Sequence, residues 1–215
     1  MSETTVHSQL KTGILLMNLG TPDSTDTADV RRYLRQFLSD PKVLDMSALG
    51  RFALLNFIIL PFRPKNTSEA YQAIWTERGS PLLTNTEDLA EKLRTKMDSP
   101  IKVAMRYGNP SVASALDAFA EEGIDEIIAV PLFPHYAASS FGSAAEHVME
   151  EAGKRWNVPN IRIFSPFYDD PNYIEALSRR IKESLDPFPA EKLLFSYHGI
   201  PEHQCTKSDT SGGQH

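Results

Sequence analysis

One histidine stands where an apolar run meets a turn, in the segment FSYHGIP. Its imidazole could accept a proton or bind a divalent metal, because the ordinary pKa of histidine lies near 6.5. Further possible metal ligands follow close behind His198, namely His203, Cys205 and His215, but their spacing matches no standard structural zinc pattern. A structural histidine in a turn is the alternative to a chemical role.

Three other kinds of chemistry compete with a metal site. The loop NLGTP resembles a phosphate-binding turn, but it has a single glycine and lacks the lysine of a P-loop. Nucleophilic catalysis by Cys205 or a loop serine lacks a Gly-x-Ser-x-Gly elbow. The last interpretation is an apolar ligand pocket with His198 as its base and with Arg63 and Arg106 at an anionic rim. The residues alone leave these interpretations open.

Strands that alternate with helices must position these residues. Helical spacing and apolar runs predict strands at residues 12–18, 101–105, 125–133, 161–164 and 192–197. They also predict helices that begin near Ser24 or Asp26, near Asn66–Ser68, at the Thr84–Glu87 capping box, at Pro110, near Ser143 and near Asn172. This order predicts an α/β fold, a parallel sheet with helices on both faces.

The chemically unusual loops all follow strands. NLGTP, MRYGNP, HYAASSFGS and YHGIP each lie where a predicted strand ends. Ligands bind at the carboxyl ends of the strands in open parallel sheets. We therefore expect one edge of the sheet to carry the site.

Composition excludes several classes of protein. The 215 residues are 41% hydrophobic, and the formal charge of −6 argues against a protein that follows nucleic-acid phosphates. One cysteine excludes an internal disulfide and fits a reducing compartment. The polar start, MSETTVHSQLKTG, has no apolar core of signal-peptide length, so we expect a cytoplasmic protein that binds no nucleic acid.

The longest apolar run, FALLNFIIL, begins at Phe52 and ends at Leu60 (residues 52–60). It is too short to span a membrane. It could form a buried core helix that Pro61 and Pro64 end. It could also form an exposed apolar lip that takes up an apolar ligand or contacts a membrane surface, with Arg51, Arg63 and Lys65 at the headgroups.

Five segments in order give the chain a resemblance to the ferrochelatase family. They are LLMNLGTPDS, FRPKNTSEAYQAIWTERGSPLL, VAMRYGNPSV, VPLFPHYAASSFGS and FSYHGIP, and they extend from Gly13 to Pro201. The second segment is similar to the proteobacterial form. Members of this family insert ferrous iron into protoporphyrin IX to form haem, in a cleft between two Rossmann-like lobes.

The resemblance implies roles for particular residues. His198 matches the active-site histidine, as proton acceptor or first metal ligand, and Leu19 matches the residue on the opposite side of the macrocycle. Arg63 and Ser80 match positions near the porphyrin propionates. The remaining matches line the cleft, and these are Arg106, Tyr107 and Tyr136. Residues 49–65 match the apolar lip, which favours the exposed interpretation and a peripheral membrane contact.

The resemblance also implies an unfinished second lobe. We expect a complete chelatase-like lobe over residues 1–156 and the start of a second over residues 157–215, so the chain is read as a fragment without the family's active-site glutamate. We expect no cofactor beyond the iron substrate, and one thiol cannot hold an iron–sulfur cluster. A non-catalytic porphyrin-binding remnant is the alternative, and the chain as written is expected to insert metal poorly.

Overall fold

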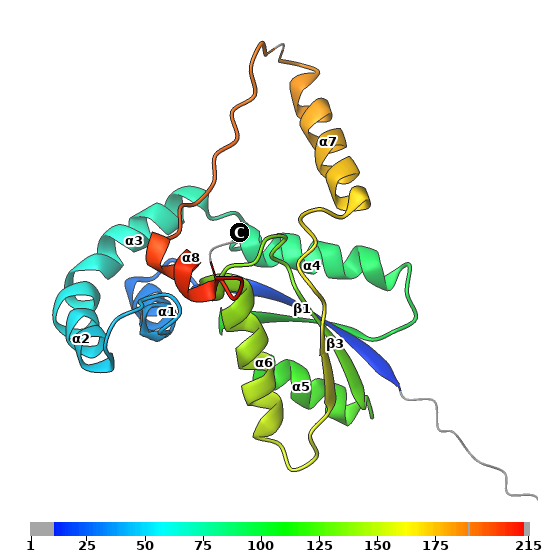
Figure 1. Ribbon diagram of the computed structural model, residues 1–215, viewed down its shortest axis with the longest axis horizontal. Helices are drawn as coiled ribbons and strands as arrows, with labels where there is room; N and C mark the ends of the chain where they lie inside the picture. The colour runs from blue at the N-terminus through cyan, green and yellow to red at the C-terminus, as the bar shows by residue number, and fades with distance from the viewer. Residues whose placement is uncertain (1–10, 189, 213–215) are drawn as a thin grey trace, which may run out of the picture. The chain divides into compact units, whose positions relative to one another are not determined.

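The computed structural model describes residues 11–188 and 190–212 (Figure 1). The polar start of the chain, residues 1–10, and the candidate ligand His215 lie outside these residues. The chain divides into two compact units, Met1–Ser165 and Pro166–His215. Each unit is described by itself.

The first unit contains a parallel sheet of four strands. These are β1 (Thr12–Thr21), β2 (Ile101–Gly108), β3 (Glu126–Pro131) and β4 (Asn160–Ile163), in the spatial order β2-β1-β3-β4. Leu16 of β1 lies opposite Val103 of β2 and Val130 of β3. The chain leaves β1 toward one side for β2 and returns to the other side for β3. This reversal of strand order is where ligands bind in doubly wound sheets.

Helices cover both faces of this sheet, as the sequence predicts. Successive side chains of a strand point to opposite faces. Leu15 and Met17 therefore pack with α5 (Val112–Glu121) and α6 (Ser143–Gly153). Ile14 and Leu16 instead share an apolar cluster with Ala90 of α4 (Pro81–Arg94). The prediction of an α/β fold is confirmed.

Four helices connect β1 to α4. They are α1 (Thr27–Ser39), α2 (Ala48–Ala53), the π-helix η1 (Leu54–Ile59) and α3 (Leu60–Ile74). A third apolar cluster joins all of them except α2. Val30, Tyr33 and Leu34 of α1 are buried here at the predicted helical spacing. Tyr107 at the end of β2 belongs to the same cluster, so these helices pack against the carboxyl edge of the sheet.

Two predicted helix starts are wrong, and each of the two observed helices has a proline in its first turn. We expected Pro61 and Pro64 to end the apolar run, but α3 begins at Leu60 and contains both prolines. We expected the next helix at the Thr84 capping box, but α4 begins at Pro81. Pro81 costs α4 no hydrogen bond, because the first-turn amide has no acceptor within a helix that follows an extended residue. Pro61 instead lies where the π-helix η1 passes directly into α3. Pro64 lies inside α3, where it is buried.

The boundary between the units also differs from our expectation. We assigned residues 161–164 to the second lobe, but β4 pairs with β3 in the sheet of the first unit. Ile161 and Ile163 pack against the cluster that α6 covers. This burial holds β4 in the first unit, which ends at Ser165 rather than at residue 156.

The second unit contains α7 (Pro171–Leu185) and α8 (Glu202–Ser208). No strand forms at residues 192–197 in the described part of this unit, so that prediction is wrong. A strand needs a neighbour for its backbone hydrogen bonds, and the described part of this unit offers no other strand. Leu194 is 92% exposed as a result.

No helix in the described ranges is long and apolar enough to cross a membrane.

Candidate functional site

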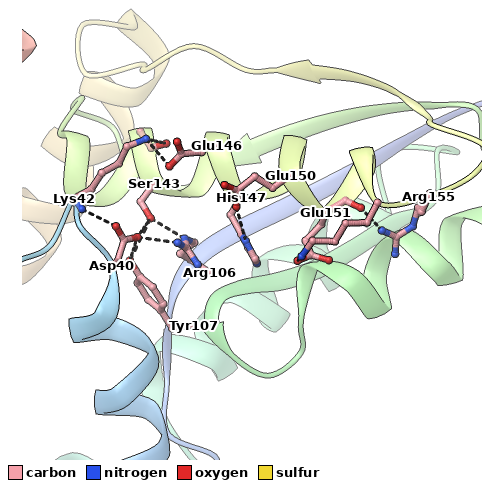
Figure 2. Close-up of polar contacts among 12 residues, drawn as sticks. Asp40, Lys42, Arg106, Tyr107, Ser143, Glu146, His147, Glu150, Glu151 and Arg155 are labelled. Carbon is pink, nitrogen blue, oxygen red and sulfur yellow. Dashed lines mark hydrogen bonds and ion pairs between the residues drawn. The ribbon is translucent and has the colours of Figure 1, made fainter. Parts of the chain in front are cut away.

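A buried carboxylate organises the carboxyl end of β2 (Figure 2). Asp40, the C-cap residue of α1, is only 6% exposed. Its Oδ2 accepts hydrogen bonds from Arg106 Nη2 at 2.7 Å, Tyr107 Oη at 2.7 Å and Ser143 Oγ at 2.5 Å. Its Oδ1 accepts one from the backbone amide of Lys42 at 2.7 Å. We call these five residues the Asp40 cluster.

The members of the Asp40 cluster come from three segments of the chain. Asp40 and Lys42 follow α1, Arg106 and Tyr107 end β2, and Ser143 begins α6. Arg106 Nε also donates to Ser143 Oγ at 2.7 Å, and its guanidinium carbon lies 4.5 Å from the centre of the Tyr107 ring. The cluster therefore ties three loops of the carboxyl edge together.

The cluster shifts the acidity of its members. Burial by itself would raise the pKa of Asp40, but the hydrogen bonds from Ser143, Tyr107 and the Lys42 amide, with the charge of Arg106, bring that pKa below its ordinary value. Burial raises the pKa of Tyr107. Burial and the charge of Arg106 lower the pKa of His147 on α6. Near neutral pH the cluster is therefore an aspartate–arginine ion pair beside a neutral tyrosine.

A cavity of about 520 Å³ adjoins this cluster. Its walls come from the end of α1, the end of β2 and one side of α6, and they include Asp40, Arg106, Tyr107, Glu146, His147 and Glu150. Lys42 pairs with Glu146 at 2.8 Å. Three carboxylates, Asp40, Glu146 and Glu150, line the cavity with one arginine, Arg106, so this lining does not favour an anion.

Leu19 lies at the end of β1, beside β2. It packs against the apolar cluster that contains Tyr107. The next residue, Gly20, has φ of +119°, and a Cβ there would lie 1.9 Å from the Tyr107 carbonyl oxygen. The glycine of the NLGTP loop is therefore required by the close approach of β2, and phosphate binding is not needed to explain it.

Ser80 occupies a separate pocket near the ends of β1 and β2. It is the N-cap residue of α4, is 5% exposed and makes no capping hydrogen bond through its side chain. Trp75, Asn109 and Thr21 share this cavity of about 310 Å³. Thr21 Oγ1 is buried and has no hydrogen-bond partner in the described structure. The N-terminus of a helix carries partial positive charge, which favours an anionic group beside Ser80. Asp23 and Arg78 also line the pocket, and each is already in an ion pair, with Arg32 and Asp88.

The lip divides into a buried and an exposed side. Leu55 and Leu60 are buried with α1, as the core interpretation requires. Phe52, Phe57 and Ile58 are 57–70% exposed, as the second interpretation requires. The run is therefore buried on one side and exposed on the other.

Two basic residues of the lip differ in their surroundings. Arg51 donates to the backbone carbonyls of Leu44 and Met46 and so helps to fold α2. Arg63 is exposed and makes no ion pair within the described ranges. Arg63 is thus available to a carboxylate ligand, whereas Arg106 is already paired.

The two remaining expected site residues are both exposed. Tyr136, 54% exposed, lies between β3 and the π-helix η2 (Ala138–Gly142), and its ring packs 5.6 Å from that of Phe141. His198 belongs to the second unit, and its Nδ1 lies 2.6 Å from the carbonyl oxygen of Gly199. A carbonyl can only accept a hydrogen bond, so Nδ1 carries the proton. Nε2 is left with a lone pair for a proton or a metal.

Sequence reasoning missed Asp40, Ser143 and His147. The available signal was Arg106, a cation between the buried strand residues Met105 and Tyr107, which requires a carboxylate partner. Nothing local to Asp40 identifies that partner, since 66 residues separate the two. Across the described residues, no group of three or more His, Cys, Asp or Glu side chains lies close enough to hold a metal ion.

Comparison with known proteins places this fold in a family. The family model described as Ferrochelatase matches residues 11–211. A ferrochelatase of Alcanivorax borkumensis is 43% identical over 206 residues, covering 93% of this chain and 60% of the relative. Ferrochelatases of Coxiella burnetii and Legionella pneumophila are 42% and 41% identical and are covered to 57% and 60% of their length. The chain thus spans about 60% of the length of these relatives.

Proposed function

Because this chain belongs to the ferrochelatase family, we propose that it takes part in the insertion of ferrous iron into protoporphyrin IX. The observation that carries this proposal is the family match over residues 11–211, which includes every residue we expect at the site. Porphyrin and ferrous iron are the substrates, and no resident cofactor is needed for the chemistry.

His198 is the residue we assign to proton transfer or first metal contact. Two pyrrole N–H protons must leave a free porphyrin as the metal enters, so the reaction needs an acceptor. The hydrogen bond to the Gly199 carbonyl supports this role, because it leaves Nε2 as the basic nitrogen. The same lone pair could bind the incoming metal first.

The porphyrin is a flat apolar ring with carboxylate groups, and two features of the first unit suit it. The exposed aromatic side of the lip offers apolar surface beside Arg63, a cation without an ion pair in the described structure. Ser80 offers a hydroxyl at the N-terminus of α4. We assign the propionates to Arg63 and Ser80, and the ring to a surface that includes Leu19 and Tyr136. Arg106 and Tyr107 support this surface through the Asp40 cluster.

The lip is our candidate for a peripheral membrane contact. Replacing Phe57 and Ile58 with serine should weaken binding to anionic liposomes and slow porphyrin uptake. If both side chains enter the lipid, the lost transfer free energy is about 3–5 kcal/mol. Both side chains are at least 59% exposed, so the melting temperature should hardly change. Liposome co-sedimentation and thermal unfolding measure the two effects.

A matched control is Trp156→Ser, which removes another exposed apolar side chain outside the lip. It should leave liposome binding unchanged. If the melting temperature of the lip variant falls by many degrees, Phe57 and Ile58 belong to the core of the protein. If the parent and both variants bind liposomes equally well, the lip makes no membrane contact.

Metal insertion tests the proposed function directly. We would compare this chain with a chimera in which residues 1–211 are followed by the C-terminal part of the Alcanivorax borkumensis relative beyond the matched region. The chimera should insert Zn²⁺ into deuteroporphyrin, seen as the change in porphyrin fluorescence, while the chain alone should stay near the protein-free rate. A chimera at the protein-free rate would contradict the proposal and would favour a non-catalytic porphyrin-binding protein.

A further inference from the structure

We propose that Asp40 is a positioning residue, which holds the ends of β2 and the start of α6 in the one arrangement that binds the porphyrin. The ligand part of this inference rests on the proposed function, whereas the mechanical part does not. Asp40 itself touches no ligand. Its carboxylate is 3% exposed and already accepts hydrogen bonds from four donors.

Asp40 decides where the Arg106 guanidinium can point. Nε and Nη2 of Arg106 are both committed, to Ser143 and Asp40, and the side chain is 17% exposed. A side-on bidentate contact to a propionate, through Nε and Nη2, would require one of these bonds to break. Arg106 is therefore a fixed part of the wall, and Asp40 is the group that fixes it.

The cluster also fixes the loop after β3. Ser143 directly follows η2, and Lys42 Nζ donates to the carbonyl oxygen of Gly142 at the end of η2 at 3.4 Å. Phe141 of η2 is buried and packs against the Tyr136 ring. Release of Ser143 from Asp40 would therefore loosen the segment that presents Tyr136.

On its other side the cluster reaches β1 through Tyr107. The Tyr107 ring packs edge-on against Phe37 at 5.3 Å, in the apolar cluster against which Leu19 also packs. The hydroxyl of Tyr107 is held by Asp40 at 2.7 Å. A single carboxylate thus joins three of the loops that carry our candidate binding residues.

The test compares Asp40→Asn with a matched control, Arg155→Gln. The Arg155 side chain is 17% exposed, like that of Arg106, and it pairs with Asp117 at 2.6 Å. It lies beyond the C-terminus of α6, away from the Asp40 cluster. In hydrogen exchange, Asp40→Asn should speed amide exchange about tenfold in peptides that span residues 105–111 and 137–146. Arg155→Gln should affect only peptides near residues 113–117 and 151–156.

Porphyrin affinity supplies the second readout. By mesoporphyrin fluorescence titration of the 215-residue chain, the dissociation constant should rise about tenfold for Asp40→Asn and stay at the parent value for Arg155→Gln. A merely structural role would lower the folded fraction, and so the amplitude of the titration, but not the affinity of the folded molecules.

Each outcome decides a separate point. Unchanged exchange at residues 137–146 in Asp40→Asn would overturn the coupling, and faster exchange with parent affinity would overturn the positioning role. A parent chain that does not bind mesoporphyrin would contradict the proposed function, while the exchange data would still decide the coupling. If Asp40→Asn fails to fold, Ser143→Ala keeps the ion pair, and it should show the same pattern with smaller changes.

Discussion

His198→Ala in the chimera should lower the rate of zinc insertion by about 10²–10⁴-fold, the usual contribution of a positioned acid–base group. Alanine removes the only nitrogen that we assign as acceptor of the pyrrole protons. The Gly199 carbonyl holds the other ring nitrogen at 2.6 Å and thereby sets the tautomer that is lost. The Michaelis constant for porphyrin should change little, because the propionates and the ring contact other residues.

The matched control is His203→Ala, on α8 of the same unit. That variant should insert zinc at the rate of the parent chimera. An His198→Ala rate above one-tenth of the parent rate would show that another group accepts the protons, and the role of His198 would be reassigned.

Asp40→Ala should cost the first unit about 3–5 kcal/mol of unfolding free energy, because it leaves the buried Arg106 charge without its partner. For a unit of this size that corresponds to a fall in melting temperature of about 10 °C. Thermal and urea unfolding at pH 7 measure the loss. Tyr107→Phe removes one donor and keeps the ion pair, so it should cost only about 1–2 kcal/mol. An Asp40→Ala cost below that of Tyr107→Phe would contradict this account.

The lowered pKa of Asp40 also makes stability depend on pH. Its carboxyl has an ordinary pKa of 3.8 and a lower one in the folded protein. The stabilisation is therefore complete well above pH 3.8 and is lost as the pH falls through the folded pKa.

His147 adds a second loss of folding stability, at a higher pH than Asp40. Its folded pKa lies below the ordinary 6.5, so the unfolded chain gains the proton first as the pH falls. The parent should therefore lose stability in two stages, below pH 6.5 and again below pH 4. Asp40→Ala should lose less stability in the second stage, which keeps only the contribution of other carboxylates with lowered pKa values, such as Asp29, Asp88 and Glu151. Parallel curves for parent and variant below pH 4 would contradict the assignment.

Hydrophobic periodicity determined the elements of this protein, because a strand or helix exposes its pattern within a short stretch of chain. Val30, Tyr33 and Leu34 identify α1, and the nearly continuous apolar run of β3 indicates a sheet covered on both faces. Together they place the loops NLGTP, MRYGNP and HYAASSFGS at the carboxyl edge of the sheet, whereas YHGIP follows no strand in the described structure. The five sequence segments, the last of which contains His198, were also sufficient to identify the family.

Tertiary structure alone decided which partners these elements take. The apolar pattern of residues 161–164 would suit a strand in either lobe. Only their pairing with β3 assigns them to the first unit. Residues 192–197 have a strand-like composition but no neighbouring strand in the described part of their unit. The lip combines buried Leu55 with exposed Phe57 because one side of η1 faces α1.

The same reason explains the Asp40 cluster. A buried charge pair is favourable only where its geometry is good and further hydrogen bonds satisfy both groups. The spacing of residues along the sequence gives no information on burial or on geometry. Arg106 could be recognised from its strand as a cation in need of a partner. That Asp40 is the partner, and that Nε and Nη2 of the arginine are already hydrogen-bonded, follows from the packing of α1, β2 and α6 around one carboxylate.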